Sequence, residues 1–176
     1  AVGSPVGVFY GYKTAGVYAT SADADADGLY MKDATGAATY FQAGDVRFID
    51  LNGDKVIDEK DKTVIGDPNP DIYGNVFATL TWKRFTLGLN FTYSVGNDIY
   101  NYQRSILNSG SNFYNQQVAE IAHWRYEGQQ TNMPRLAYGD PMGNNRFSDR
   151  WIENGGFFKC KNINLTYRIP VPASST

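Results

Sequence analysis

Cysteine and histidine are almost absent from this sequence of 176 residues, which contains only Cys160 and His123. A single cysteine excludes an internal disulfide. The sequence also lacks a Gly-x-Ser-x-Gly motif, a His-Glu-x-x-His motif and a phosphate-binding loop. The carboxylates within 50–61 are better explained by a cation or by water than by a glycosidase pair, which needs two carboxylates across a cleft. We therefore expect a protein that is not an enzyme.

No charge of one sign dominates, because 16 Lys and Arg against 18 Asp and Glu give a formal net charge of −2. Nucleic-acid-binding domains present a basic patch or stripe, so we expect no nucleic-acid partner. Residues 1–11 lack the charged leader and apolar core of a signal peptide. They read like the interior of a longer chain, and we expect the sequence to be a fragment.

Long apolar runs are also missing, since no stretch approaches the ~18 residues of a transmembrane helix. Transmembrane β-strands stay possible, because their ~10-residue alternating segments disappear in a hydropathy average. Aromatic residues are abundant, with 13 Tyr and 10 Phe. Together with many Gly, Asn and Thr, they indicate a β-protein.

Two segments show period-two alternation of apolar and polar residues: "IYGNVFATLTW" at 72–82 and "FTLGLNFTYSV" at 85–95. Only Lys83 and Arg84 separate them. Each segment has the length of a tilted transmembrane strand, ~9–11 residues. Two further strands are predicted near 5–18 and 157–169, the first with a phase shift at Gly16 that indicates a bulge.

The predicted strands are joined by a long, a short and a long connection, with the long ones at 19–71 and 96–156. Bacterial outer-membrane barrels alternate tight periplasmic turns with long extracellular loops. We therefore predict an all-β fold: an antiparallel transmembrane β-barrel segment of about four strands with two long extracellular loops. A soluble β-sandwich also explains the alternation, and it stays open as an alternative. Within the second loop, the spacing of apolar residues predicts a short helix in 113–128.

The stretch "DLNGDKVIDEKD" at 50–61 has the spacing of a calcium-binding loop. Such loops place oxygen ligands at positions 1, 3, 5, 7, 9 and 12. The residues at those positions are Asp50, Asn52, Asp54, Val56 through its carbonyl, Asp58 and Asp61. Lys55 stands at position six, where glycine is usual. We expect a structural Ca²⁺ site that pins a long loop, and the alternative is a merely acidic, solvated turn.

The order of several motifs resembles the C-terminal part of the SusC/RagA family of TonB-dependent outer-membrane transporters from Bacteroidetes. The motifs are Gly44–Asp61, "IGDPNPDIYG" at 65–74, "GNDIYN" at 96–101 and "RFSDRWIENGGFFKCKNINLTY" at 146–167. The resemblance covers nearly the whole chain. It implies that residues 1–176 form part of the β-barrel domain of a larger, 22-stranded, plugged barrel in the outer membrane of a bacterial cell.

The resemblance also implies a function: import of oligosaccharides, or in some members of peptides, driven by the TonB complex. A SusD-like lipoprotein would cover the extracellular mouth, and the TonB complex would act through parts absent from this chain. Aromatic side chains of the second loop could stack on sugar rings, and the candidates are Tyr100, Tyr102, Tyr114, Trp124 and Tyr126. The alternative function is that of a soluble, calcium-dependent module that binds carbohydrate or protein.

Overall fold

The computed structural model describes residues 3–32 and 35–170. The fold is mainly β, with antiparallel strand pairs and few helices. The three long strands are β7 (Ile72–Trp82), β8 (Phe85–Val95) and β11 (Phe157–Tyr167). The short strands are β1 (Phe9–Tyr12), β2 (Thr14–Val17), β3 (Tyr30–Lys32), β4 (Ala38–Tyr40), β5 (Val46–Phe48), β6 (Lys62–Gly66), β9 (Asp98–Tyr100) and β10 (Ile152–Asn154). The helices are α1 (Ser21–Asp27), α2 (Tyr102–Leu107) and the 3-10 helices η1 (Glu59–Asp61), η2 (Val118–Ala122) and η3 (Asp149–Trp151).

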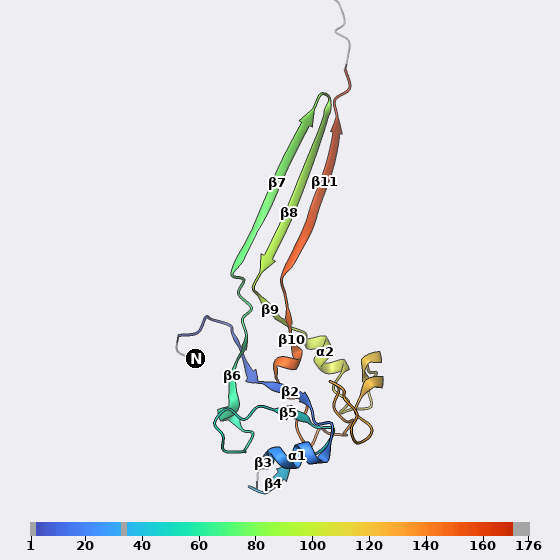
Figure 1. The fold of residues 1–176 in the computed structure, drawn as a ribbon. Coiled ribbons are helices and arrows are strands. Elements are labelled where there is room, and N and C mark those ends of the chain that lie inside the picture. Colours follow the sequence, from blue (N-terminus) through green and yellow to red (C-terminus); the bar gives the residue numbers. More distant parts are fainter. Residues whose placement is uncertain (1–2, 33–34, 171–176) are drawn as a thin grey trace, which may run out of the picture.

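The long strands form one antiparallel sheet in the order β11-β8-β7, which projects from the rest of the molecule (Figure 1). β7 and β8 pair along their whole length, from Ile72 opposite Val95 to Trp82 opposite Phe85. Lys83 in the turn has a φ of 53°, the sign that tight two-residue hairpin turns require at this position. The bounds of β7 and β8 coincide with the alternating segments of the sequence, while β11 ends at Tyr167 rather than at 169.

One side of this sheet is apolar over its whole length, because apolar residues lie opposite apolar residues in every strand pair. Ala78 lies opposite Leu89, for example, and Leu80 opposite Leu87. Alternate positions, such as Thr79 opposite Gly88, form the other side, which we call the polar side because it is mainly polar, although it also carries Phe77. We call the first side the apolar face; its members are Ile72, Val76, Ala78, Leu80, Trp82, Phe85, Leu87, Leu89, Phe91, Tyr93, Val95, Phe158, Cys160, Ile163, Leu165 and Tyr167.

A β-bulge in β11 keeps that strand in phase with the apolar face. Cys160 lies opposite Phe91 and Ile163 opposite Leu89, with a register shift between Cys160 and Asn162. Without the extra residue of the bulge, Cys160 and Ile163 would point to opposite sides of the sheet. The strand therefore contributes apolar side chains to one side both before and after the bulge.

No other described element covers the apolar face. Leu80 and Leu165 are 60% and 69% exposed, although they lie in the interior of their strands. Phe91 stacks on Phe158 with ring centroids 5.3 Å apart, which is a contact within the face and not with a second layer. The described residues thus form an open three-stranded sheet, and neither a sandwich nor a closed barrel is seen among them.

The segment 5–18, which we expected to form one strand of the same sheet, is divided. β1 pairs with β6 and β2 pairs with β5, both outside the long sheet. Positive φ angles at Gly7 and Gly16 (88° and 93°) interrupt the extended chain. Tyr12 and Tyr18 are also buried in the apolar core outside the long sheet. Their burial there keeps this segment from running along the long sheet. The long sheet accordingly has three strands from this chain rather than four.

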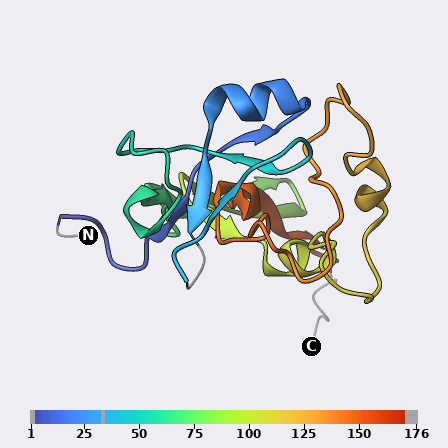
Figure 2. The same cartoon turned by 90° about the horizontal axis from the view of Figure 1, so that it is seen from below.

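Both long connections lie at the same end of the sheet, opposite the Lys83–Arg84 turn (Figure 1). Together with the described residues of 3–18 they form one packed unit, which we call the loop body: the described residues of 3–71 and 96–156. Its apolar core consists of Tyr12, Tyr18, Ala24, Leu29, Phe41, Val46, Phe48, Ile57 and Met142. Figure 2 shows the loop body end on, with α1 along one border and the coil of η2 at another.

The helix expected in 113–128 is only the short 3-10 helix η2. Its apolar residues Val118 and Ile121 are exposed, so no buried stripe stabilises an α-helix there, and short helices depend on such packing. No helix in residues 3–32 and 35–170 is long and apolar enough to cross a membrane.

Candidate functional site

The stretch 50–61 folds as a tight loop around the carboxylate of Asp50. The backbone N–H groups of Asn52, Gly53 and Lys55 donate to the two oxygens of Asp50, over 3.2, 2.7 and 2.7 Å. Desolvation raises the pKa of Asp50, but the backbone hydrogen bonds from Lys55, Gly53 and Asn52 outweigh it, so the pKa lies below its ordinary value. The Asp50 side chain is therefore a charged carboxylate at neutral pH, as a ligand of a cation needs to be.

Lys55, at position six of this loop, has a φ of 64°. This is the left-handed conformation for which calcium loops use glycine at that position. A Cβ added to Gly28 would lie 3.6 Å from Nζ of Lys55. The ammonium group therefore lies near the C-terminal end of α1, where the helix dipole favours a cation, and its presence at position six does not prevent the loop backbone from forming.

Asp61 closes the loop from its other end. Its carboxylate is completely buried and accepts the N–H groups of Leu51 over 3.0 Å and Asp58 over 2.9 Å. The Asp54 carboxylate accepts the N–H of Val56 and the Nδ2 group of Asn52. These acidic side chains thus stabilise the loop by accepting hydrogen bonds from N–H groups of the loop itself.

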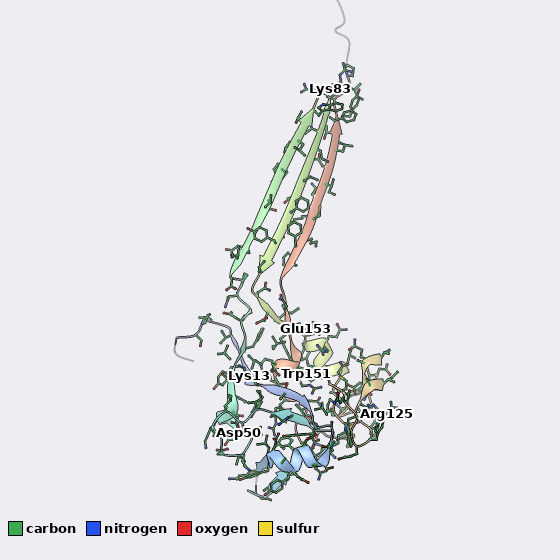
Figure 3. All side chains as sticks on the ribbon, in the orientation of Figure 1. Lys13, Asp50, Lys83, Arg125, Trp151 and Glu153 are labelled. Atoms are coloured by element: carbon green, nitrogen blue, oxygen red, sulfur yellow. The ribbon has the colours of Figure 1, made fainter. Side chains whose placement is uncertain are left out.

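In the described part of the chain, no group of three or more His, Cys, Asp or Glu side chains lies close enough together to hold a metal ion. The backbone of 50–61 fits a calcium loop, whereas its carboxylates are turned towards N–H groups. The six predicted ligands, Asp50, Asn52, Asp54, Val56, Asp58 and Asp61, therefore remain a prediction. Figure 3 shows Asp50 at the side of the loop body away from Arg125.

The five candidate aromatic residues are spread over the second connection and differ in exposure. Tyr102, Tyr114 and Tyr126 are exposed, and their rings are accessible to a ligand or partner. Tyr100 is half-buried, donates to or accepts from the Ser105 hydroxyl over 2.9 Å and packs edge-on against Phe147. Its ring is part of the packing of the loop body.

Trp124 is also half-buried and holds the two long connections together. Its Nε1 group donates to the carbonyl of Ala19 over 3.2 Å, and a Cβ added to Gly44 would lie only 2.6 Å from its ring. The ring is thus packed against the backbone of the first connection. The structure does not bring the five predicted residues together into one site.

An exposed aromatic pair was not anticipated from the sequence. Phe113 and Tyr138 stack with ring centroids 5.2 Å apart, although they are 93% and 75% exposed. A shallow groove beside η2 is lined by Val118, Ile121 and Leu136, among others. Large exposed apolar patches mark interaction sites on proteins. We call the three groove residues Val118, Ile121 and Leu136 the η2 patch.

No family model matches the sequence. The chain is similar to the TonB-dependent receptors P3 and P26 of Formosa agariphila, each 30% identical, over 96% and 97% of this chain and 16% of either receptor. It is 28% identical to the TonB-dependent receptor SusC of Bacteroides thetaiotaomicron, over 68% of this chain and 11% of SusC. The chain thus spans about a sixth or less of the length of these relatives.

Chains of solved structures are similar to this chain in fold. A chain of the RagAB peptide importer in its closed-closed state superposes with a TM-score of 0.62 at 23% identity, and a chain of the RagAB peptide transporter with a TM-score of 0.66 at 22% identity. Each alignment covers 93% of this chain and 16% of the other. The open sheet and the loop body therefore recur as a part of larger chains.

Proposed function

This chain belongs to the SusC/RagA family of TonB-dependent receptors, and we propose on that premise that it forms wall and outer loops of an outer-membrane nutrient importer. The long sheet supplies part of a transmembrane β-barrel, and the loop body lies on the extracellular side. The uncovered apolar face of the sheet is the observation that carries this proposal.

The proposed orientation turns the apolar face towards lipid and the polar side towards the barrel lumen. Each long strand has 11 residues, which matches the ~9–11 residues of a tilted transmembrane strand. Aromatic residues stand at the turn end of the face, where Phe85 packs on Tyr167 with centroids 4.8 Å apart and Trp82 lies opposite Phe85. Aromatic girdles of this kind border the apolar band of membrane barrels.

The partners follow from the same orientation. A SusD-like surface lipoprotein meets the loop body, and the exposed η2 patch offers it apolar contact area. The TonB complex supplies energy through parts of the receptor outside this chain. The segment itself has no catalytic role, in keeping with relatives that are receptors and importers.

The cargo is an oligosaccharide or a peptide. The exposed rings of Tyr102, Tyr114 and Tyr126 support stacking on sugars, because an aromatic ring presents a flat apolar body with a polar tip. Tyr100 and Trp124 contribute by holding the loop body in shape. Uptake by cells that produce Tyr114→Ala receptor should fall if this ring contacts cargo, and unchanged uptake would remove it from the site.

Calcium binding at 50–61 is proposed as a structural function within the importer. The left-handed conformation of Lys55 supports it, since it occurs at position six, where calcium loops use glycine. A bound Ca²⁺ would be held by Asp50, Asn52, Asp54, the Val56 carbonyl, Asp58 and Asp61, and it would stiffen the first connection.

The alternative, a soluble calcium-dependent module, is less well supported. In a soluble protein the apolar face would need a second layer, because contiguous exposed apolar surface of this extent favours association. The described residues contain no such layer. Open strand edges on β7 and β11 would add to the tendency to aggregate.

Epitope insertion in the full receptor tests the proposed topology. One variant carries a peptide epitope between Lys83 and Arg84, and a matched variant carries it between Tyr114 and Asn115 in the loop body. We expect antibody to label intact cells only for the second variant and to label both after permeabilisation of the outer membrane. Labelling of the Lys83–Arg84 epitope on intact cells would contradict the proposal.

A further inference from the structure

A polar cavity of about 430 Å³ opens between α2, η2 and β10 on the loop body. This volume lies within the ~300–1,000 Å³ of small-molecule sites. Most of its wall is polar and comes from segments distant in sequence, namely α2, the residue before η2 and β10. The residues that matter below are Arg104, Asn108, Gln117, Met133 and Glu153; Figure 3 shows Glu153 near the junction of the loop body and the sheet.

The cavity contains one charge of each sign, and the two are already paired. Nη1 of Arg104 lies 2.9 Å from Oε1 of Glu153, which also accepts the Nδ2 group of Asn101 over 3.1 Å. The hydrogen bond from Arg104, followed by the one from Asn101, holds the pKa of Glu153 below its ordinary value. A ligand with a net charge would therefore gain little here, because each fixed charge is compensated.

The same pair leaves hydrogen-bonding groups available. The bonds described above use Nη1 of Arg104 and Oε1 of Glu153, so the other guanidinium N–H groups and Oε2 of Glu153 can serve a ligand. The carboxamide of Gln117, an exposed residue, adds both donors and acceptors. The wall thus offers donors and acceptors side by side, with Met133 as an apolar contact.

Asn108 is the strongest sign of a ligand. It lines the cavity and is only 3% exposed, yet its Oδ1 atom has no hydrogen-bond partner among the described residues. A buried acceptor without a donor costs free energy, ~1–3 kcal/mol. An O–H or N–H group of a ligand, or a water molecule, would satisfy it, whereas a leucine of similar size would avoid the cost.

We propose that this cavity binds a neutral, hydroxyl-rich ligand, namely one or two sugar rings of the cargo. A hydroxyl group both donates and accepts, so it can bridge the free groups of Arg104 and Glu153 without breaking their ion pair. The apolar side of the sugar ring rests on Met133. This inference rests on the proposed importer function and specifies the cargo class at one subsite.

Binding to the purified full receptor tests the inference, separately from transport. The receptor is placed in phospholipid nanodiscs, so that no sugar-based detergent is present. Saturation-transfer NMR is then recorded with a panel of glucose, galactose, mannose, xylose, maltose and cellobiose, and with the zwitterionic dipeptide Gly-Gly as comparator. We expect saturation transfer to at least one sugar and none to Gly-Gly.

The variants Asn108→Leu and Gln117→Leu are expected to weaken sugar binding at least tenfold. Asn108→Leu should also leave the melting temperature unchanged or higher, because it removes an unsatisfied buried oxygen. Gln116→Leu is the matched control, since Gln116 is next in sequence but lies outside this cavity, and it should bind like the unchanged receptor.

Three results would overturn the inference: no transfer to any sugar of the panel, transfer that survives both cavity variants, or transfer to Gly-Gly that they abolish. None of these would affect the proposed importer function, which is read from topology and uptake. Conversely, a receptor with the wrong topology that still binds sugar through Asn108 would contradict the importer and leave the cavity assignment standing.

Discussion

Arg135 donates from Nε to Oδ1 of Asp45 over 2.8 Å, and this ion pair joins the two long connections. Asp45 is completely buried. Its carboxylate also accepts the Nδ2 group of Asn144 over 3.1 Å and the N–H group of Gln42 over 2.9 Å. Segments that are far apart in the sequence therefore meet at one charged side chain, and the loop body behaves as one unit.

Removal of this link should loosen the loop body. Asp45→Ala leaves Arg135 without its partner and removes the acceptor for two further donors. Because the Arg135 side chain is 31% exposed, the cost should lie below the ~3–5 kcal/mol of a fully buried pair. We expect faster cleavage in 109–140 by a protease added to the full receptor, measured by gel and mass spectrometry. Glu59→Gln, which affects the exposed Lys62–Glu59 pair, should change little; equal cleavage in the two variants would contradict this account.

Gly44 should tolerate no side chain. Its φ is 84° and a Cβ would lie 2.6 Å from the Trp124 ring, so Gly44→Ala combines backbone strain of ~1–2 kcal/mol with a steric clash. Gly53 has a similar φ of 78° but no atom within 4 Å of its added Cβ. Gly53→Ala should therefore show the strain alone, and we expect the melting temperature to fall clearly more for Gly44→Ala. A larger fall for Gly53→Ala would mean that the packing of Trp124 has little weight.

A charge on the apolar face should disturb membrane assembly. Leu89→Arg places a guanidinium group on that face near the middle of β8, at an expected cost of ~2–4 kcal/mol at the bilayer midplane. Asn90→Arg, on the polar side of the same strand, should be tolerated. Quantification of the folded, heat-modifiable receptor in outer-membrane fractions would distinguish the two, and equal yields would argue against a lipid-facing role for Leu89.

Calcium should stabilise the first connection if 50–61 is a metal site. For a dissociation constant of ~10⁻⁴–10⁻³ M, typical of extracellular modules, ~10 mM Ca²⁺ would add about 1.4–2.7 kcal/mol. Lys55→Gly should increase the effect, because it removes a positive charge that repels the cation from the loop, whereas Asp50→Asn should weaken it. The readout is protection of 50–61 from proteolysis; absence of any Ca²⁺ response in the unchanged receptor would exclude the site.

The long strands could be predicted because their signal is local. Period-two alternation in 72–82 and 85–95 depends only on neighbouring residues, and the tight turn at Lys83 follows from the gap between them. The bulge after Cys160 was not visible in the sequence, because it appears only when β11 is paired with β8. Likewise, the division of 5–18 into two short strands depends on the burial of Tyr12 and Tyr18. Their packing partners come from other segments of the chain, so the local sequence does not show it.

The loop body was largely unpredictable from the sequence for the same reason. Asp45 and Arg135 are individually ordinary residues, and only the fold brings them into contact. α1 is an exception, since Thr20 accepts the N–H of Asp23 as an N-cap and Gly28 ends the helix in a left-handed conformation. These capping signals are local and present in the sequence, although no helix was predicted from them.

The candidate site likewise has one part that the local sequence predicts and another that depends on the fold. The calcium spacing of 50–61 is contiguous and therefore readable, and the left-handed conformation required at Lys55 is found. Cavity residues such as Asn108 and Glu153 come from different segments, and nothing in their local sequence distinguishes them. The stacking of the exposed rings of Phe113 and Tyr138 also depends on the fold, which brings two separate segments together. Local sequence patterns do not indicate that contact.

Accessibility of successive positions along β8 tests the central claim most directly. In a full receptor with Cys160→Ser, single cysteines replace Leu87, Gly88, Leu89, Asn90, Phe91 and Thr92 in turn. Each variant, in native membranes, is treated with a water-soluble, membrane-impermeant thiol reagent. We predict labelling at Gly88, Asn90 and Thr92 and protection at Leu87, Leu89 and Phe91. Uniform labelling, or protection on the polar side only, would contradict an apolar face that is turned towards lipid.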